Sequence, residues 1–235
     1  MSDRCDIASR LFIAIPAYTG TIEHDTMHSV LDGMIQLRAL GMHVTMGVLE
    51  GCCYLCHARN QMVADFLDSD CTDMLFVDAD MGFGVDSLAR ICAATRPLVA
   101  GIYRKKCDRM DFNLKLPSKT HNCEEDGTLV VEAAATGFLR INRAVFDAMK
   151  PNTMEFGRDS DPKKCDRRWR NYFRTLYEDG LFWGEDFQFC RDALAAGFKT
   201  HVIPDLTLRH VGKKVYEGNW AQWMASNGAA KQRVA

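Results

Sequence analysis

The sequence predicts an α/β fold in which helices cover both faces of a mainly parallel β-sheet. Short apolar runs that are typical of buried strands alternate with helical patterns through the first hundred residues. Pro16 ends the first apolar run and Gly41 ends the first helical pattern. The chain has 235 residues, of which 47% are hydrophobic, enough for one large core. Strands that alternate with helices indicate right-handed βαβ units, in which ligands bind beyond the carboxyl ends of the strands.

The first half of the chain is expected to contain four strands and three helices. The strands are predicted at 11–16, 43–49, 74–77 and 98–102, and the helices at 26–40, 58–67 and 86–94. Thr26 is expected to cap the first of these helices. The loop at 16–20 and the acidic residues after 77 then fall at the same edge of the sheet.

The second half has a weaker pattern. Residues 105–127 form a polar loop, and strands are expected at 128–134 and 138–142, before a short helix at 143–149. An irregular segment at 151–174 precedes a helix at 185–196 and strands at 200–204 and 206–209. The tail, 216–235, is expected to hold one short helix at most.

Composition excludes several classes of protein. A net charge of −2 gives no general attraction to nucleic acid or to an anionic membrane. The chain shows no signal-peptide pattern and no apolar run long enough to span a bilayer, so a cytoplasmic location is expected. Most of the ten cysteines are typical of buried thiols in a reducing compartment. A structural zinc site remains an alternative, either at Cys53 and Cys56 or among Cys107, His121, Cys123 and Cys165.

Two acidic residues follow the third predicted strand directly. Asp78 and Asp80 come after the apolar run at 74–77. On an extended chain they leave the same face, where two carboxylates repel unless a cation lies between them. Mg²⁺ and Mn²⁺ prefer such oxygen ligands and often bind together with diphosphate. The alternative is an acidic turn before the helix that starts near Val85.

With these elements in order, the chain resembles the GT-A family of nucleotide-sugar-dependent glycosyltransferases, in particular its small family-2-like members. The matching segments, in chain order, are Ile-Ala-Ile-Pro-Ala-Tyr at 13–18, Ala-Arg-Asn at 58–60, the D-x-D motif Asp-Ala-Asp at 78–80, Thr-Gly-Phe at 136–138, Gly-Glu-Asp at 184–186 and Leu-Arg-His at 208–210. The resemblance implies a single Rossmann-like GT-A domain over 1–235. Its nucleotide-binding half would cover about 8–104, and a small, loop-rich acceptor and catalytic half about 105–215, followed by the tail at 216–235.

The resemblance also implies a metal site and a catalytic base. Asp80, together with Asp78 and His210, would bind Mn²⁺ or Mg²⁺, although His210 could instead be a hydrogen-bonded histidine at a strand end. Asp186 would deprotonate the acceptor hydroxyl, and Glu185 would orient the acceptor or exchange roles with it. Both acids could also be ordinary residues of a helix start. In-line displacement with inversion at the anomeric carbon is a hypothesis that follows from this assignment.

The nucleoside-diphosphate sugar is expected to contact several further residues. Tyr18 would pack on the base and Arg59 would reach the diphosphate or ribose, while the remaining contacts would come from Pro16, Ala17, Asp78, Ala79 and Gly137. Each also has a structural explanation: Tyr18 as a residue of the core rim, Asn60 as a brace of its helix, and Gly137 as a bend between strands. Gly20 stands where many members of the family carry an acidic or asparagine residue, so the base identity stays open.

A basic and aromatic segment precedes the expected base. Residues 158–174 alternate arginine and lysine with Trp169, Tyr172 and Phe173, a pattern that could bind a polyanionic acceptor such as a hydroxylated base in nucleic acid or a phosphorylated glycan. Its acidic residues also allow a solvated loop. Two alternatives to sugar transfer are nucleotidyl transfer or hydrolysis of a sugar-nucleotide diphosphate, and a non-catalytic module that binds sugar nucleotide or nucleic acid. The loop at 16–20 lacks the glycine-rich, basic signature of nucleotidyltransferases.

Overall fold

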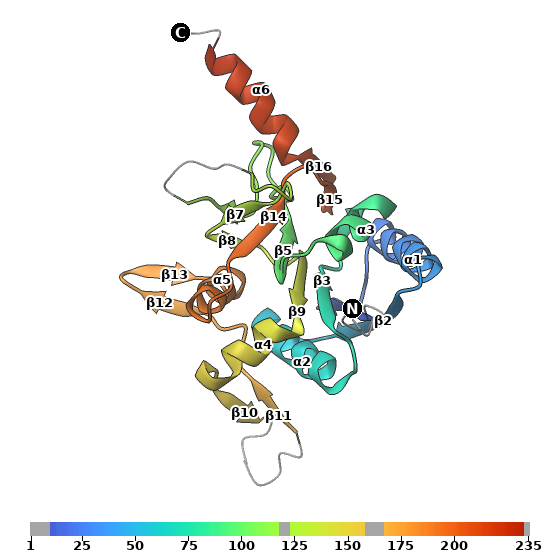
Figure 1. Cartoon of the computed structure of the whole chain (residues 1–235), viewed down its shortest axis with the longest axis vertical. Coiled ribbons are helices and arrows are strands. Elements are labelled where there is room, and N and C mark those ends of the chain that lie inside the picture. The colour runs from blue at the N-terminus through green and yellow to red at the C-terminus, as the bar shows by residue number, and fades with distance from the viewer. Residues whose placement is uncertain (1–9, 118–122, 158–166, 233–235) are drawn as a thin grey trace, which may run out of the picture.

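The computed structural model describes residues 10–117, 123–157 and 167–232, with side chains described up to 227. Its largest sheet has seven strands (Figure 1). In spatial order they are β2 (His43–Glu50), β1 (Arg10–Ala17), β3 (Asp73–Val77), β9 (Phe138–Asn142), β5 (Leu98–Gly101), β14 (Thr200–Ile203) and β7 (Leu129–Val131). The pairs β1–β2, β1–β3 and β5–β14 are parallel, whereas β9 and β7 run against their neighbours. The predicted α/β class with a mainly parallel sheet is confirmed.

Helices cover both faces of this sheet, as expected. Helices α1 (His24–Ala39) and α3 (Val85–Ala93) pack on one face. The other face carries α2 (Leu55–Asp68), α4 (Arg143–Met149) and α5 (Glu185–Ala195). Because successive side chains of a strand alternate between faces, Leu75 and Val77 of β3 join the first core while Met74 and Phe76 join the second.

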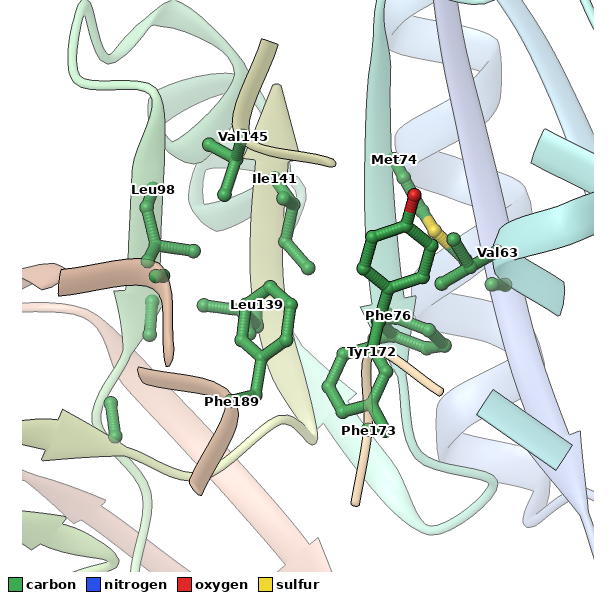
Figure 2. Close-up of a cluster of buried hydrophobic side chains, with 14 of the residues drawn as sticks. Val63, Met74, Phe76, Leu98, Leu139, Ile141, Val145, Tyr172, Phe173 and Phe189 are labelled. Atoms are coloured by element: carbon green, nitrogen blue, oxygen red, sulfur yellow. The ribbon is translucent and has the colours of Figure 1, made fainter. Parts of the chain in front are cut away.

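Figure 2 shows the second core, where β3 and β9 meet α5 and the segment before it. The rings of Phe173 and Phe189 stack with centroids 4.4 Å apart, and Phe76 meets Phe173 edge-on at 5.3 Å. Full burial of a phenylalanine side chain stabilises a protein by about 1.5–3 kcal/mol. These three buried rings therefore hold the start of α5 against the carboxyl half of β3.

A second, three-stranded sheet lies beyond the end of β3. Its order is β16 (Val215–Asn219), β15 (Thr207–Val211) and β4 (Met81–Phe83). Arg209 of β15 donates two hydrogen bonds to Asp25 of α1, at 2.8 and 2.6 Å, and so fixes the small sheet to the main body. Its guanidinium lowers the pKa of the Asp25 carboxyl, although partial burial acts in the opposite direction.

Several short elements complete the described residues. They are the ladder of β6 (Leu114–Lys115) with β8 (Ala133–Ala134), the ladder of β10 (Glu155–Gly157) with β11 (Arg168–Arg170), the hairpin of β12 (Leu176–Glu178) and β13 (Leu181–Trp183), the 3₁₀ turn η1 (Lys150–Asn152) and α6 (Trp220–Gln232). None of the helices within the described ranges is long and apolar enough to cross a membrane.

Four local predictions need correction. The strand expected at 128–134 is divided into β7 and β8, and the irregular segment at 151–174 contains the ladder of β10 and β11. Thr26 lies buried inside α1 and caps nothing, because the helix begins two residues earlier at His24. The tail holds a strand and a 13-residue helix rather than one short helix. For β7, β8, β16 and the ladder of β10 and β11, pairing with another segment decided the local structure.

Gly82 of β4 provides a test of how the small sheet is attached. A Cβ atom at Gly82 would fall inside the Asp25 carboxylate, whereas nothing lies within 4 Å of a Cβ at Gly84. Gly82→Ala should therefore displace Asp25 from Arg209 and lower the free energy of unfolding by about 1–3 kcal/mol, as overpacking does. Gly84→Ala is the control, and chemical denaturation measures both. Equal effects of the two substitutions would contradict a tight contact at Gly82.

Candidate functional site

The predicted site residues come together at one edge of the large sheet. Strands β1, β3 and β5 run in the same direction, so their carboxyl ends share this edge. Strand β9 begins there, with Phe138 opposite Val77. The amide of Asp78 donates to the carbonyl of Gly137 at 3.0 Å, which joins the D-x-D segment to the segment before β9.

The D-x-D segment is a turn rather than an extended chain. The amide of Met81 donates to the carbonyl of Asp78 at 3.0 Å, so the backbone reverses across Asp78, Ala79 and Asp80. The expectation that both carboxylates leave the same face of an extended strand is therefore wrong. The two acids contact different partners and lie in different electrostatic surroundings.

Asp78 belongs to a buried ion-pair network centred on Arg59 of α2. Arg59 is 2% exposed and donates to Asp78 at 3.1 Å and to Glu185 at 2.6 Å. Burial alone would lower the pKa of Arg59, but the neighbouring carboxylates outweigh it and raise the pKa. The guanidinium therefore stays charged and joins three elements: α2, the turn after β3 and the start of α5. The ion pair with Arg59 fixes the position of the Glu185 carboxylate.

Asp80 contacts a histidine and a lysine instead. One oxygen of its carboxylate lies 3.3 Å from Nε2 of His210, and the other accepts a hydrogen bond from Lys106. Burial opposes ionisation of Asp80, but His210 and Lys106 outweigh it and lower the pKa of the carboxyl. Strand pairing explains the contact with His210, because His210 lies opposite Met81 and the Val211 amide donates to the Asp80 carbonyl.

The orientation of His210 bears directly on metal binding. Its Nδ1 lies 2.9 Å from the carbonyl oxygen of Arg104, which can only accept, so Nδ1 carries the proton. Nε2 then faces the Asp80 carboxylate: it donates to that carboxylate when the imidazole is protonated, and it presents its lone pair when the imidazole is neutral. Two such acceptors are satisfied by a cation between them, and an imidazole whose other nitrogen donates to a carbonyl is the usual form of a metal ligand.

Asp80 and His210 therefore fit a divalent ion as a pair. Within the described residues, no group of three or more His, Cys, Asp or Glu side chains gathers around one point. The remaining coordination positions would be left for diphosphate oxygens and water, the arrangement that Mg²⁺ commonly adopts. Asp78, the third predicted ligand, contacts Arg59 instead.

Gly137 makes the close packing beside the turn possible. A Cβ atom at this position would lie 2.6 Å from the hydroxyl of Tyr103 and 2.7 Å from a carboxylate oxygen of Asp78. The Gly137 amide donates to that hydroxyl at 3.1 Å. Burial and the charge of Asp78 raise the pKa of Tyr103 well above its ordinary value, so the phenol stays neutral. The Tyr103 ring also meets His210 edge-on at 5.1 Å and restricts its orientation.

Asp186, the predicted base, lies at the start of α5. Its carboxylate accepts from the Phe187 amide at 2.7 Å. Burial raises the pKa of Asp186, the charge of Glu185 raises it further, and Arg59 only partly offsets both. A carboxylate with a raised pKa is the better proton acceptor. Since Glu185 is held by Arg59, Asp186 is the acid of this pair that has no cation bonded to it among the described residues.

The remaining predicted donor contacts lie along the same edge. Pro16 and Ala17 end β1 and are buried, whereas Tyr18 beyond them is 65% exposed. The carbonyl of Ala79 accepts from the Glu23 amide at 2.8 Å, which ties the D-x-D turn to the entry of α1. Only Tyr18 among these side chains offers a large free surface.

Asn60, next to Arg59 on α2, has a structural role. Its side chain donates to the carbonyl of Phe173 at 2.9 Å and accepts from the Phe173 amide at 2.8 Å. This pair of hydrogen bonds holds the segment before the β12–β13 hairpin against α2. The sequence allowed Asn60 to brace its own helix, but the structure shows that it braces a segment more than a hundred residues away.

The basic and aromatic segment differs from its prediction. Residues 158–166 lie outside the described part of the chain. In the rest of it, Trp169, Tyr172 and Phe173 are buried in or against the core, so these rings form no stacking platform. The arginines each pair with a carboxylate: Arg167 with Asp65 and Asp68, Arg168 and Arg170 with Glu155, and Arg174 with Asp192.

The zinc alternative finds no support in the described ranges. Cys52, Cys53, Cys56, Cys107 and Cys123 carry free thiols, and no cluster of three candidate ligands includes them. His121 and Cys165 lie outside the described residues.

Two features at this edge were absent from the sequence-based prediction. Tyr103 carries no signal of its own, because its contact with Gly137 joins two distant segments. The hairpin of β12 and β13, immediately before α5, did have a signal. Asp179-Gly180 between apolar and aromatic pairs is a strong indicator of a two-residue hairpin.

Comparison with known proteins gives a likeness of fold. No protein-family model and no curated protein matches the chain. Among solved structures it is similar to A197 from STIV, with 16% identity, a TM-score of 0.52 and coverage of 87% of this chain and 86% of that one. It is also similar to GalNAc-T7 in complex with UDP, GalNAc and Mn²⁺, with 10% identity and a TM-score of 0.49, covering 87% of this chain but 43% of that one. The inositol-1-phosphate CTP transferase from T. maritima is similar as well, with 10% identity and a TM-score of 0.45, covering 87% of this chain and 89% of that one. The likeness to A197 shows a shared fold.

The Arg59 network can be tested by removing its central cation. Arg59→Met should lower the free energy of unfolding by about 3–5 kcal/mol, because Asp78 and Glu185 lose their buried partner. Arg90→Met is the matched control, since Arg90 forms an exposed pair with Asp205 that is worth about 0–1 kcal/mol. Urea denaturation at neutral pH measures both. Similar losses in the two variants would mean that Arg59 does not hold the site together.

Proposed function

We propose that this chain is a metal-dependent glycosyltransferase of the GT-A type, which transfers a sugar from a nucleoside-diphosphate sugar to an acceptor hydroxyl. The observation that carries the proposal is the pairing of His210 with Asp80. A histidine fixed through Nδ1 presents Nε2 to a carboxylate beyond the carboxyl ends of parallel strands, where ligands commonly bind in α/β sheets. The order of the matching segments from 13 to 210 and the raised pKa of Asp186 support the same reading.

The donor would lie along the carboxyl ends of β1 and β3, in the half of the chain at about 8–104. Asp80 and His210 would hold Mn²⁺ or Mg²⁺, which supplies Lewis-acid neutralisation of the charge on the departing diphosphate. Tyr18 would pack on the base, and Asp78, oriented by Arg59, would accept hydrogen bonds from the ribose. Lys106, which now shares Asp80, would turn to a phosphate oxygen.

Asp186 would act as the general base from the half at about 105–215. The acceptor oxygen forms a bond to the anomeric carbon as the bond from that carbon to the diphosphate breaks, and the hydroxyl proton passes to Asp186. The diphosphate leaves with the bonding electron pair. A single displacement from the face opposite the diphosphate inverts the anomeric centre. Glu185 would orient the acceptor while Arg59 keeps its charge balanced.

The metal assignment predicts a specific loss of binding. Asp80→Ala and His210→Ala should each weaken Mn²⁺-dependent binding of UDP, GDP, ADP or CDP at least tenfold, whichever of them the wild type binds. Titration calorimetry with and without Mn²⁺, and the paramagnetic resonance signal of free Mn²⁺, provide the measurements. Asp205→Ala and His43→Ala are controls, because both residues are exposed and lie outside the site. Unchanged Mn²⁺ dependence in Asp80→Ala would reject the ligand assignment.

The base assignment predicts opposite effects on stability and on turnover. The raised pKa means that the folded state binds more protons than the unfolded state above the ordinary pKa of 3.8. Stability contributed by this group therefore falls as pH rises through that window, and at pH 7 the ionised carboxylate is destabilising. Asp186→Asn should raise Tm at pH 7, with a smaller gain near pH 4, while transfer or donor hydrolysis falls by about 100-fold or more.

Asp192→Asn is the matched control on the same helix. Asp192 accepts two hydrogen bonds from Arg174, so its neutralisation should lower Tm at pH 7 and leave donor affinity unchanged. Melting curves between pH 4 and 8 distinguish the two variants. A lower Tm in Asp186→Asn at pH 7, or equal losses of donor binding and turnover, would make Asp186 a structural residue.

A further inference from the structure

The hairpin of β12 and β13 exposes two aromatic rings beside the candidate site. Tyr177 is 81% exposed and Phe182 is 59% exposed, and their ring centroids lie 5.1 Å apart with a 44° tilt. Figure 1 shows the hairpin standing out from the body next to α5. Exposed aromatic side chains that gather on one surface commonly mark a binding site.

The hairpin is well defined by its sequence. Asp179 and Gly180 both have positive φ angles, 51° and 74°, as the turn of a two-residue hairpin requires. The strands pair Leu176 with Trp183 and Tyr177 with Phe182. Because side chains alternate between the faces of a strand, Tyr177 and Phe182 share one face and Trp183 lies on the other.

The opposite face anchors the hairpin to the body. The Trp183 ring packs against two cations, with Nζ of Lys115 4.5 Å and Cζ of Arg191 4.2 Å from its centroid. Arg191 also pairs with Glu178 at 2.6 Å. These contacts come from α5 and from β6, so the face that carries Tyr177 and Phe182 is held outward. The two exposed rings are thus positioned by the fold rather than left on a free tip.

The hairpin is continuous with the candidate base. Strand β13 ends at Trp183, and Gly184 alone separates it from Glu185 at the start of α5. Phe182 stands four residues before Asp186, which limits the distance between their Cα atoms to about 14 Å at full extension. In the complex proposed below, a molecule that presents a hydroxyl to Asp186 would meet the ring pair with its next unit.

We propose that Tyr177 and Phe182 form the acceptor platform, on which a sugar ring of a neutral glycan packs with its apolar C–H face. The proposal rests on the proposed glycosyltransferase function and names the acceptor class for that site. Flat aromatic surfaces bind groups that have one apolar and one polar side, as a sugar ring has. The platform would orient the acceptor so that a hydroxyl of the adjoining sugar faces Asp186.

The charges around the platform disfavour a polyanionic acceptor. Glu178 and Asp179 place carboxylates on the hairpin, and Arg191 is neutralised by Glu178. The arginines at 167, 168, 170 and 174 are already paired with carboxylates. Among the residues that the structure describes, these cations are paired and would be poorly available to a nucleic acid or a phosphorylated glycan, whereas a neutral glycan meets no charge repulsion.

The test compares neutral and anionic sugars on the same protein. Saturation-transfer NMR with maltose, cellobiose and lactose, and with glucose 6-phosphate as the anionic probe, is run on the full chain with Mn²⁺ and the nucleoside diphosphate it binds. At least one neutral disaccharide should bind, and Tyr177→Ala with Phe182→Ala should weaken that binding at least tenfold. Phe182→Tyr should retain it. Leu40→Ala, which removes another exposed apolar side chain far from the hairpin, should have no effect.

The outcomes distinguish failure of the aromatic platform from failure of the proposed glycosyltransferase function. Loss of disaccharide binding in the double variant with unchanged Mn²⁺–diphosphate binding supports the platform. Disaccharide binding that survives the double variant, binding of glucose 6-phosphate alone, or no disaccharide binding to a wild type that does bind the diphosphate would overturn it. Self-association that the double variant abolishes would assign the rings to a dimer interface and also overturn it. A wild type that binds disaccharides through these rings but no nucleoside diphosphate would refute the transferase and leave the sugar platform standing.

Discussion

The buried guanidinium of Arg59 is the interaction on which the candidate site depends. It bonds Asp78 and Glu185, which come from segments more than a hundred residues apart, and it lies 5.9 Å from the rings of both Phe76 and Phe173. Desolvation of a cation is costly, and here two carboxylates and two aromatic faces compensate for it. The result is that the turn after β3 and the start of α5 cannot shift independently.

A second constraint positions the other half of the site. The pair of Asp25 with Arg209 fastens β15 to α1 across the glycine at 82, and β15 in turn carries His210 to Asp80. The two constraints converge on the three residues from Asp78 to Asp80. Asp78 pairs with the buried Arg59, whereas Asp80 contacts a histidine and a lysine. The turn between the two carboxylates therefore gives them different surroundings, which is why the proposed function assigns the metal to Asp80.

The proposed acceptor side, at the hairpin of β12 and β13, has a different physical character. Around the D-x-D turn, the contacts are short, polar and charged, whereas the hairpin before α5 presents aromatic surface and its neighbour Arg191 is paired with Glu178. A donor with a diphosphate and a metal ion suits the first environment, and a neutral sugar suits the second. Asp186, the proposed base, follows Glu185, the acid that Arg59 holds, and so lies in the chain between these two environments.

The sequence by itself determined the order of the main strands and helices in the first half of the chain and the residues of the sheet edge. Alternation of apolar segments is a local pattern, and strand ends in a parallel sheet must share an edge. It also indicated His210 and Asp186 through the order of short motifs. It could not show that Asp78 and Asp80 diverge, because the sequence Asp-Ala-Asp is compatible both with a turn and with the end of a strand. Nor could it show that Trp169, Tyr172 and Phe173 are buried while Tyr177 and Phe182 are exposed. Those outcomes depend on contacts between segments distant in the chain, such as Asn60 with Phe173 and Arg59 with Glu185, and only the tertiary structure brings such partners together.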